Sequence, residues 1–201
     1  MNIGKRRVAT AAMLLIIGVM VADAQTQRGR AATPPASGRA QSTPASSAAS
    51  GPVIVFETVK GNFEIETYPA EAPKSVAHIL ELVKRNFYNG QRVHRIVPGQ
   101  LVQFGDPLTR DMTKKEFWGT GGSNRAIGAS ESSPKHRHVL GAVSLAHPGD
   151  PKQADSQMFI MFAAQPKYDG QFTVFGHVTT GMDVVRKLGV NDIIRRARLK
   201  S

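Results

Sequence analysis

Residues 87–106 read FYNGQRVHRIVPGQLVQFGD, and this stretch contains two short apolar runs that follow a turn signal. Asn89-Gly90 is a dipeptide typical of tight turns. The runs Val93–Val97 and Leu101–Phe104 come next, and both are too short for a buried helix. We therefore predict two consecutive β-strands here.

The segment before this stretch predicts a β-hairpin. The runs 53–59 and 62–68 lie on either side of Lys60-Gly61, and the second run alternates apolar and polar residues. Such alternation is typical of a strand with one buried face. Gly61 can take the positive φ that a tight connection requires.

Two helices are predicted, one after the hairpin and one near the C-terminus. Pro73 is suited to the first turn of a helix, and Asp183–Leu188 forms a shorter segment of the same kind. Their apolar residues recur at helical spacing: Val76, Ile79, Leu80 and Val83 in the first helix, and Val184, Val185 and Leu188 in the second.

Further short strands are predicted at 141–146, 158–163 and 172–178, with long glycine-containing loops between them. Many short strands in one domain favour a closed barrel, because closure removes exposed sheet edges. The residues alone thus predict a β-rich domain, a barrel with a helix at each end.

Six blocks, in order, resemble the motifs of the cyclophilins. A set of ordered blocks is far more specific than a single motif. Cyclophilins are peptidyl-prolyl cis–trans isomerases, and the resemblance implies a closed eight-stranded antiparallel β-barrel capped by two α-helices. It also implies that the domain binds proline-containing segments of unfolded or folding proteins and needs no cofactor. The blocks are Phe87–Gly90 with Val93–Gly99, Val102–Pro107, Gly119–Gly122, Gly141–Ala146, Asp155–Ile160 and Tyr168–Gly176.

Arg95 is the catalytic residue that the resemblance implies, through the motif His-Arg-Ile-Val-Pro-Gly. Rotation about an X–Pro bond is slow because amide resonance raises a barrier of ~18–20 kcal/mol. A guanidinium stays charged and offers a planar fork of donors. It can donate to the amide nitrogen or carbonyl as the bond twists. Without the motif, a surface arginine in a salt bridge is the ordinary interpretation.

The resemblance also implies a set of substrate-binding residues. Phe159 and Leu101 match the apolar proline pocket, although each could also belong to the core. Gln103 and Gln157 match two glutamines that bind the substrate backbone or brace the arginine. The remaining positions are Ala146 and His147 at the edge where substrate backbone pairs, and Gln100, Tyr168 and Phe172 around the pocket.

Several of these positions depart from the usual family residues. Gln100 stands where many cyclophilins have a phenylalanine, which predicts weaker binding of short peptides. Lys167 stands in place of a tryptophan that binds cyclosporin, so we predict weak cyclosporin binding. His147, Tyr168 and Phe172 replace asparagine, leucine and histidine. Together these departures predict altered specificity with activity retained.

The N-terminus predicts an exported protein. Residues 5–7 are basic, residues 8–22 are uncharged, and residues 22–24 place small residues at the two positions a signal peptidase needs. We predict a signal peptide over residues 1–24, cleaved after Ala24, and a periplasmic or other extracytoplasmic location without stable membrane insertion after cleavage. An uncleaved N-terminal anchor is the alternative.

The rest of the chain divides by composition. Residues 25–51 are rich in Ala, Ser, Thr and Pro. Such a stretch cannot bury enough apolar surface to offset the conformational entropy lost on folding, so we predict a disordered linker. Residues 52–194 form the predicted isomerase domain, and residues 195–201 a solvated basic tail.

The net charge of +11 does not by itself indicate nucleic-acid binding, because five of these charges lie in the first 51 residues and four basic residues crowd into 195–201. We predict no nucleic-acid partner and, from the family, a monomer. The chain has no cysteine, which excludes disulfides and thiolate chemistry.

Other kinds of site were considered. His136 and His138 are two residues apart, but no further ligands are suggested nearby, and we predict no metal. Ser144 lacks the setting of a hydrolase nucleophile. The alternative function is a non-catalytic cyclophilin-fold domain that holds proline-containing segments as a chaperone or adhesion factor.

Overall fold

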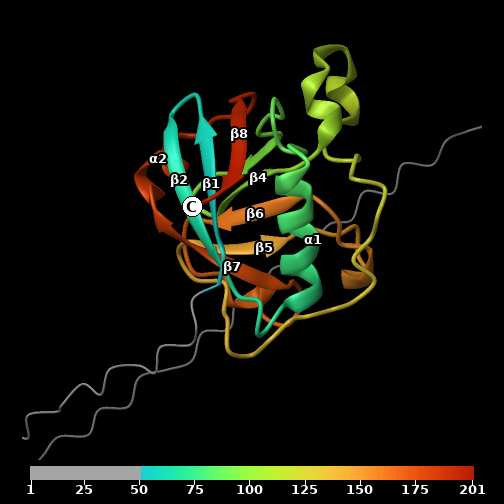
Figure 1. Ribbon diagram of the computed structural model, residues 1–201, viewed down its shortest axis with the longest axis vertical. Helices are drawn as coiled ribbons and strands as arrows, with labels where there is room; N and C mark the ends of the chain where they lie inside the picture. The colour runs from blue at the N-terminus through green and yellow to red at the C-terminus, as the bar shows by residue number, and fades with distance from the viewer. Residues whose placement is uncertain (1–50) are drawn as a thin grey trace, which may run out of the picture. The chain divides into compact units, whose positions relative to one another are not determined.

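The computed structural model describes residues 51–201, which form one eight-stranded antiparallel sheet and two α-helices (Figure 1). The predicted signal peptide and nearly all of the predicted linker lie outside the described residues. The strands are β1 (Val53–Thr58), β2 (Gly61–Thr67), β3 (Arg95–Val97), β4 (Leu101–Phe104), β5 (Ala142–Leu145), β6 (Met158–Met161), β7 (Val174–Thr180) and β8 (Ile194–Leu199). The helices are α1 (Pro73–Lys84) and α2 (Met182–Lys187), with 3₁₀ turns η1 (Pro107–Arg110), η2 (Met112–Phe117), η3 (Pro151–Gln153) and η4 (Pro166–Tyr168).

The predicted hairpin is confirmed. β1 pairs with β2 so that Thr58 lies opposite Gly61, whose φ of 127° is open to glycine. The Thr58 hydroxyl donates to the Gly61 carbonyl at 2.7 Å and tightens the turn. Phe56 and Phe63 are directly opposite and stack with ring centroids 5.1 Å apart.

The sheet curls strongly, but a continuous ladder does not close it. The strand order is β3-β4-β6-β5-β7-β2-β1-β8, so β3 and β8 are its edges. Between them lies an isolated bridge from Arg92 to Ile193, with the Val93 N–H donating to the Asp192 carbonyl at 2.9 Å. The predicted eight-stranded antiparallel fold is confirmed, and only its full closure was overstated, because β3 has three residues and Val93 pairs outside it.

The prediction that residues 195–201 form a solvated basic tail is wrong, because most of them belong to strand β8, which pairs with β1. Ile194 and Ala197 are buried in the core. A register shift between Glu57 and Thr58 leaves Arg195 and Arg196 both exposed. The arginines thus face solvent while the backbone completes one edge of the sheet.

The core lies inside the curl. Alternate residues of the strands point inward, and apolar side chains of both helices belong to the same core. In the view of Figure 1, α1 and α2 lie toward opposite ends of the curled sheet. Of the apolar helix positions that the sequence predicts to face inward, Leu80 and Val184 are only partly buried. Leu82, which was not among them, is buried in the core. The largest fully buried side chains are Tyr88, Phe56, Phe63, Phe104, Phe175, Ile54, Ile65, Ile79, Leu145, Met158, Ile160 and Met161.

A second, smaller apolar cluster lies on the outer face of the strands. It consists of Leu101, Ala142, Phe159, Met161 and Val174. Their strand neighbours, such as Val102 and Ile160, belong to the inner core, because successive side chains of a strand point to opposite faces. This outer cluster supports the candidate site.

Candidate active site

Arg95, Gln103 and Phe159 form a row across three neighbouring strands. Arg95 on β3 lies opposite Gln103 on β4, and Gln103 lies opposite Phe159 on β6. Residues directly opposite each other share one face of a sheet. The structure therefore brings together three residues that are up to 64 positions apart in the sequence, on the outer face of the barrel.

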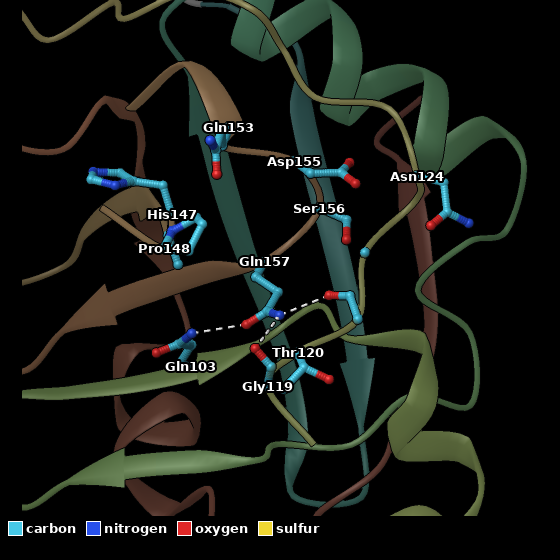
Figure 2. Close-up of a pocket in the computed structure, with 13 residues that line it drawn as sticks. Gln103, Gly119, Thr120, Asn124, His147, Pro148, Gln153, Asp155, Ser156 and Gln157 are labelled. Atoms are coloured by element: carbon cyan, nitrogen blue, oxygen red, sulfur yellow. Dashed lines mark hydrogen bonds between the residues drawn. The ribbon is translucent and has the colours of Figure 1, made fainter. Parts of the chain in front are cut away.

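A chain of hydrogen bonds continues from this row. Arg95 Nη1 donates to Gln103 Oε1 at 3.0 Å. Gln103 Nε2 donates to Gln157 Oε1 at 2.9 Å, as Figure 2 shows. Gln157 Nε2 then donates to the carbonyls of Gly119 and Gly121 at 2.9 and 2.8 Å. Arg95 is exposed, yet its guanidinium is oriented by a fixed partner and keeps further N–H donors for a ligand.

An aromatic cluster adjoins the row. Phe159, at 3% exposure, meets Phe172 edge to face with centroids 5.2 Å apart and Tyr168 at 6.0 Å. Tyr168 and Phe172 also meet edge to face at 5.4 Å, and both pack against the cluster that contains Leu101. These half-buried rings provide an apolar surface beside the Arg95 guanidinium, which suits a proline ring.

His138 supports this cluster and was not predicted as part of the site. Its ring stacks on Phe159 with centroids 6.0 Å apart, and its Nδ1 lies 2.9 Å from Asp169 Oδ1. Burial lowers the pKa of His138, and the hydrogen bond from the His138 backbone N–H lowers the pKa of Asp169. A neutral imidazole with its proton on Nδ1 is therefore held behind Phe159.

A cavity of about 460 Å³ lies beside the row and shares residues with it. In the view of Figure 2, Gln157 lies near the centre of the lining, with His147 and Pro148 on one side and Asn124 on the other. The other lining residues are Gly119, Thr120, Gly121, Gly122, Ala146, Gln153, Asp155 and Ser156.

Asp155 braces one wall of this cavity. Its carboxylate accepts hydrogen bonds from His78 Nε2 at 2.9 Å and from the Ser123 hydroxyl. Burial alone would raise the pKa of Asp155, but the hydrogen bonds from His78, Ser123 and the Arg125 backbone, together with the charge interaction with His78, outweigh burial and lower it. A Cβ at Gly122 would lie 2.6 Å from Asp155 Oδ2, so a larger residue there would displace this carboxylate. The wall thereby connects to helix α1 through His78.

Asp106 holds both ends of the segment that leads into the cavity. It is fully buried, and its carboxylate accepts from the N–H groups of Leu108, Gly119 and Gly121 at 2.7, 2.5 and 3.1 Å. Three charge-assisted hydrogen bonds to backbone fix this loop more firmly than neutral ones would. The carbonyls that Gln157 contacts are consequently held in place.

The three remaining predicted residues lie around the site. Gln100 is half-buried in the β3–β4 turn, where its carbonyl accepts from the Phe162 N–H at 2.7 Å. The Ala146 N–H donates to the Gln157 carbonyl and is not free for a substrate. His147 Nδ1 accepts from Gly149 N–H at 3.2 Å, and its Nε2 lies 3.0 Å from the Gln171 carbonyl.

The two histidines that could be read as metal ligands, His136 and His138, have structural contacts instead. His136 stacks on Tyr68 with centroids 3.9 Å apart, and His138 is engaged with Asp169 as described. Within residues 51–201, no cluster of three or more His, Asp or Glu side chains is suited to hold a metal ion. In the same part of the chain, no helix is both long enough and apolar enough to cross a bilayer.

Comparison with known proteins places the chain in a family. Residues 53–200 match the model of the cyclophilin-type peptidyl-prolyl cis-trans isomerase/CLD family. A Brucella abortus protein named "Probable peptidyl-prolyl cis-trans isomerase" is 41% identical over 138 residues, which cover 67% of this chain and 70% of that protein. Peptidyl-prolyl cis-trans isomerase B of Bacillus subtilis is 35% identical over 137 residues, covering 68% and 90%.

The fold agrees with that match. A cyclophilin-type isomerase from Cryptosporidium parvum superposes with a TM-score of 0.66 at 23% identity, over 75% of this chain and 98% of that one. The chain belongs to the cyclophilin-type peptidyl-prolyl cis–trans isomerases. Its activity is the isomerisation of X–Pro peptide bonds, and the resemblance seen in the sequence motifs is confirmed.

Proposed function

We propose that Arg95 catalyses the isomerisation and that the aromatic cluster holds the substrate proline. The observation that carries this proposal is the hydrogen bond from Arg95 to Gln103, which holds the guanidinium beside Phe159 and its neighbours. The proline ring packs on Phe159 and Leu101, with Tyr168 and Phe172 around it. One N–H of Arg95 serves Gln103, and the others face the substrate amide.

Catalysis then follows from differential binding. As the X–Pro bond twists, its nitrogen becomes pyramidal and gains a lone pair that can accept a hydrogen bond from Arg95. The planar ground state lacks that lone pair, so the interaction favours the twisted state. Each ten-fold gain in rate requires ~1.4 kcal/mol of this preferential stabilisation. Gln103 and Gln157 fix the position from which Arg95 donates.

The clients, in this proposal, are exported proteins that fold outside the cytoplasm. The support is the sequence of residues 1–24, with its basic start, apolar run and small residues at 22–24. The protein acts as a monomer, does not bind nucleic acid and is not stably inserted in a membrane after cleavage. Lys167, whose ammonium lies 5.2 Å from the Tyr168 ring centroid, replaces an aromatic contact for cyclosporin and makes that ligand bind weakly.

The test compares the chain lacking its first 24 residues with the same chain carrying Arg95→Ala. NMR exchange spectroscopy on Ala-Xaa-Pro-Phe peptides measures isomerisation without a coupling protease. We expect the variant to lose ten-fold or more in kcat/KM, ~1.4 kcal/mol of transition-state stabilisation. Arg95 is exposed, so the fold should be unaffected, which circular dichroism checks.

A parent chain that is folded and binds these peptides but accelerates none of them would support the alternative, a domain that only holds proline-containing segments. Equal rates for parent and Arg95→Ala would instead leave the isomerase activity in place and remove Arg95 from its mechanism. Export is tested separately, by locating the mature N-terminus after expression in a bacterium.

A further inference from the structure

Residues 107–118 form an ordered projection, which we call the arm. It consists of η1 and η2, and Figure 1 shows these yellow-green turns extending away from the sheet. Asp106 clamps both of its ends, as described above. Arg110 Nε also donates to the Asn89 carbonyl at 2.9 Å, and Trp118 Nε1 donates to the Asp111 carbonyl at 3.3 Å.

The tip of the arm exposes two large apolar side chains. All six residues of η2 are exposed, and Met112 and Phe117 are 45% and 52% accessible. About half of each side chain stays accessible to solvent, so the arm gains only part of the stabilisation that full burial of a methionine and a phenylalanine would give. Exposed apolar residues on a rigid element are typical of a binding surface.

The arm leads directly into the cavity beside Arg95. Phe117 begins a turn in which its carbonyl accepts from both the N–H and the hydroxyl of Thr120, at 3.1 and 2.7 Å. Thr120 lines the cavity, together with Gly119, whose carbonyl accepts from Gln157. The first and last Cα atoms of such a turn lie within about 7 Å. Phe117 is therefore at the rim of the substrate site.

We infer that the arm is a second contact for unfolded clients, which binds an apolar stretch of the polypeptide whose X–Pro bond lies at Arg95. This rests on the proposed function of Arg95 and Phe159, and it extends the substrate class from an isolated X–Pro unit to a proline flanked by apolar residues. Met112 is suited to this role because its unbranched side chain adapts to varied partners.

Charge favours a polypeptide over an anionic membrane as the occupant. Lys114 pairs with Asp111 at 3.6 Å, and Lys115 lies 6.0 Å from the Trp118 ring centroid. With Arg110 and Glu116 included, the arm carries a net charge of only +1. Surface attraction to anionic lipid requires several uncompensated basic residues.

The test uses the chain without its first 24 residues and a Met112→Ser/Phe117→Ser variant. One set of peptides carries Ala-Ala-Pro-Phe joined through four glycine or serine residues to Leu-Phe-Leu, on either side of the proline. A second set has Ser-Ser-Ser in place of Leu-Phe-Leu. The four-residue spacer spans up to about 13 Å, because an extended residue spans about 3.3 Å.

We expect the parent to show a KM about five-fold lower for at least one Leu-Phe-Leu peptide than for its Ser-Ser-Ser counterpart, with equal kcat. The variant should lose this difference and still isomerise Ala-Ala-Pro-Phe at the parental rate. A matched control, Val59→Ser/Val190→Ser, removes two exposed apolar side chains outside the cavity lining and should keep the difference.

Three results would overturn the inference: a KM difference that survives in the arm variant, one that is equally lost in the control, or none in the parent. Binding of phosphatidylserine vesicles that depends on Phe117 would assign the arm to a membrane instead, and Phe117-dependent dimerisation in sedimentation would assign it to a second copy. If the parent fails to isomerise Ala-Ala-Pro-Phe, the catalytic proposal fails, whatever the arm does.

Discussion

Gln103 is the residue on which the geometry of the site depends most. It accepts from Arg95 and donates to Gln157, so it orients the guanidinium relative to the cavity wall. It is nearly buried, at 9% exposure. Removing it leaves polar partners unsatisfied on both sides, which costs more than the mean value of a hydrogen bond.

For Gln103→Leu we expect kcat to fall about ten-fold, ~1.4 kcal/mol, with little change in KM, because the proline surface stays intact. Gln103→Glu keeps an acceptor for Arg95 and loses only the donor to Gln157, so it should retain more of kcat than the leucine variant. NMR exchange measurements over a range of peptide concentrations separate kcat from KM. If Gln103 had a purely structural role, kcat would fall equally in both variants, in proportion to their loss of stability.

The sequence motifs were sufficient to predict which residues form the row, since Arg95, Gln103 and Phe159 each lie in a recognisable block. They did not predict the supporting residues. His138 was considered only as a metal ligand, because its partner Asp169 is 31 positions away. His78 and Asp155 are 77 positions apart, and neither lies in a local pattern that indicates the other.

Strand β8 was not predicted because its charged residues obscure the sequence pattern of a strand. Its sequence, Ile-Arg-Arg-Ala-Arg-Leu, has few apolar residues, and the register shift at Arg195 breaks the alternation that indicates a strand. The arm was missed for a similar reason, since short 3₁₀ turns have no extended hydrophobic period. Strand β2 and helix α1 were predicted because their buried residues recur at strand and helical spacing.

The strand assignment predicts that the last residues are essential to the fold. A chain that ends after Ile193 loses the burial of Ile194, worth roughly 1.5–3 kcal/mol, and the ladder to β1, at about 0.5–1.5 kcal/mol per hydrogen bond. Together these approach the total stability of a typical domain. We expect no cooperative thermal transition by circular dichroism.

The matched control for this truncation is Arg195→Gln/Arg196→Gln/Arg198→Gln, which removes the charges and keeps the strand. Arg198 contacts Glu57 at 3.0 Å, a partly exposed pair of small value, so the control should melt within a few degrees of the parent. A truncated chain that still melts cooperatively would show that β8 is a dispensable tail.

At the scale of the whole molecule, the structure predicts that stability falls in mild acid. Burial lowers the pKa of His94, His138 and His177. The unfolded chain therefore takes up these protons near pH 6.5, before the folded chain does. The stabilisation is fully present above that pH and is lost as pH falls through the folded pKa values.

Chemical denaturation at pH 7.5, 6.5, 5.5 and 5.0 measures this dependence. The range stays above the titration of Asp155 and Asp169, whose pKa values are lowered. His138→Leu should reduce the slope by up to ~1.4 kcal/mol per pH unit, the value for one proton. An unchanged slope in that variant, or a parent that is more stable at pH 5 than at pH 7.5, would contradict the prediction.

The overall fold was predicted well, because the ordered motifs and the strand runs agree on one architecture. Closure was not predictable, since it depends on how far β3 extends, and this is decided by the long-range contact of Val93 with Asp192. No local pattern in 87–106 specifies a partner that lies almost a hundred residues later. Topology was available from the sequence, and the completeness of the ladder was not.

The placement of the site on the outer face has a consequence for how this protein can change. Along β4 and β6, Leu101, Gln103, Phe159 and Met161 face the outer cluster or the site, while Val102, Phe104, Met158 and Ile160 face the core. Neighbouring positions are thus constrained by different requirements, core packing at one and the site at the next. In a deep mutational scan, we expect the positions sensitive for folding to alternate with those sensitive for activity along each strand. Client preference can then be redesigned at every second residue without rebuilding the interior.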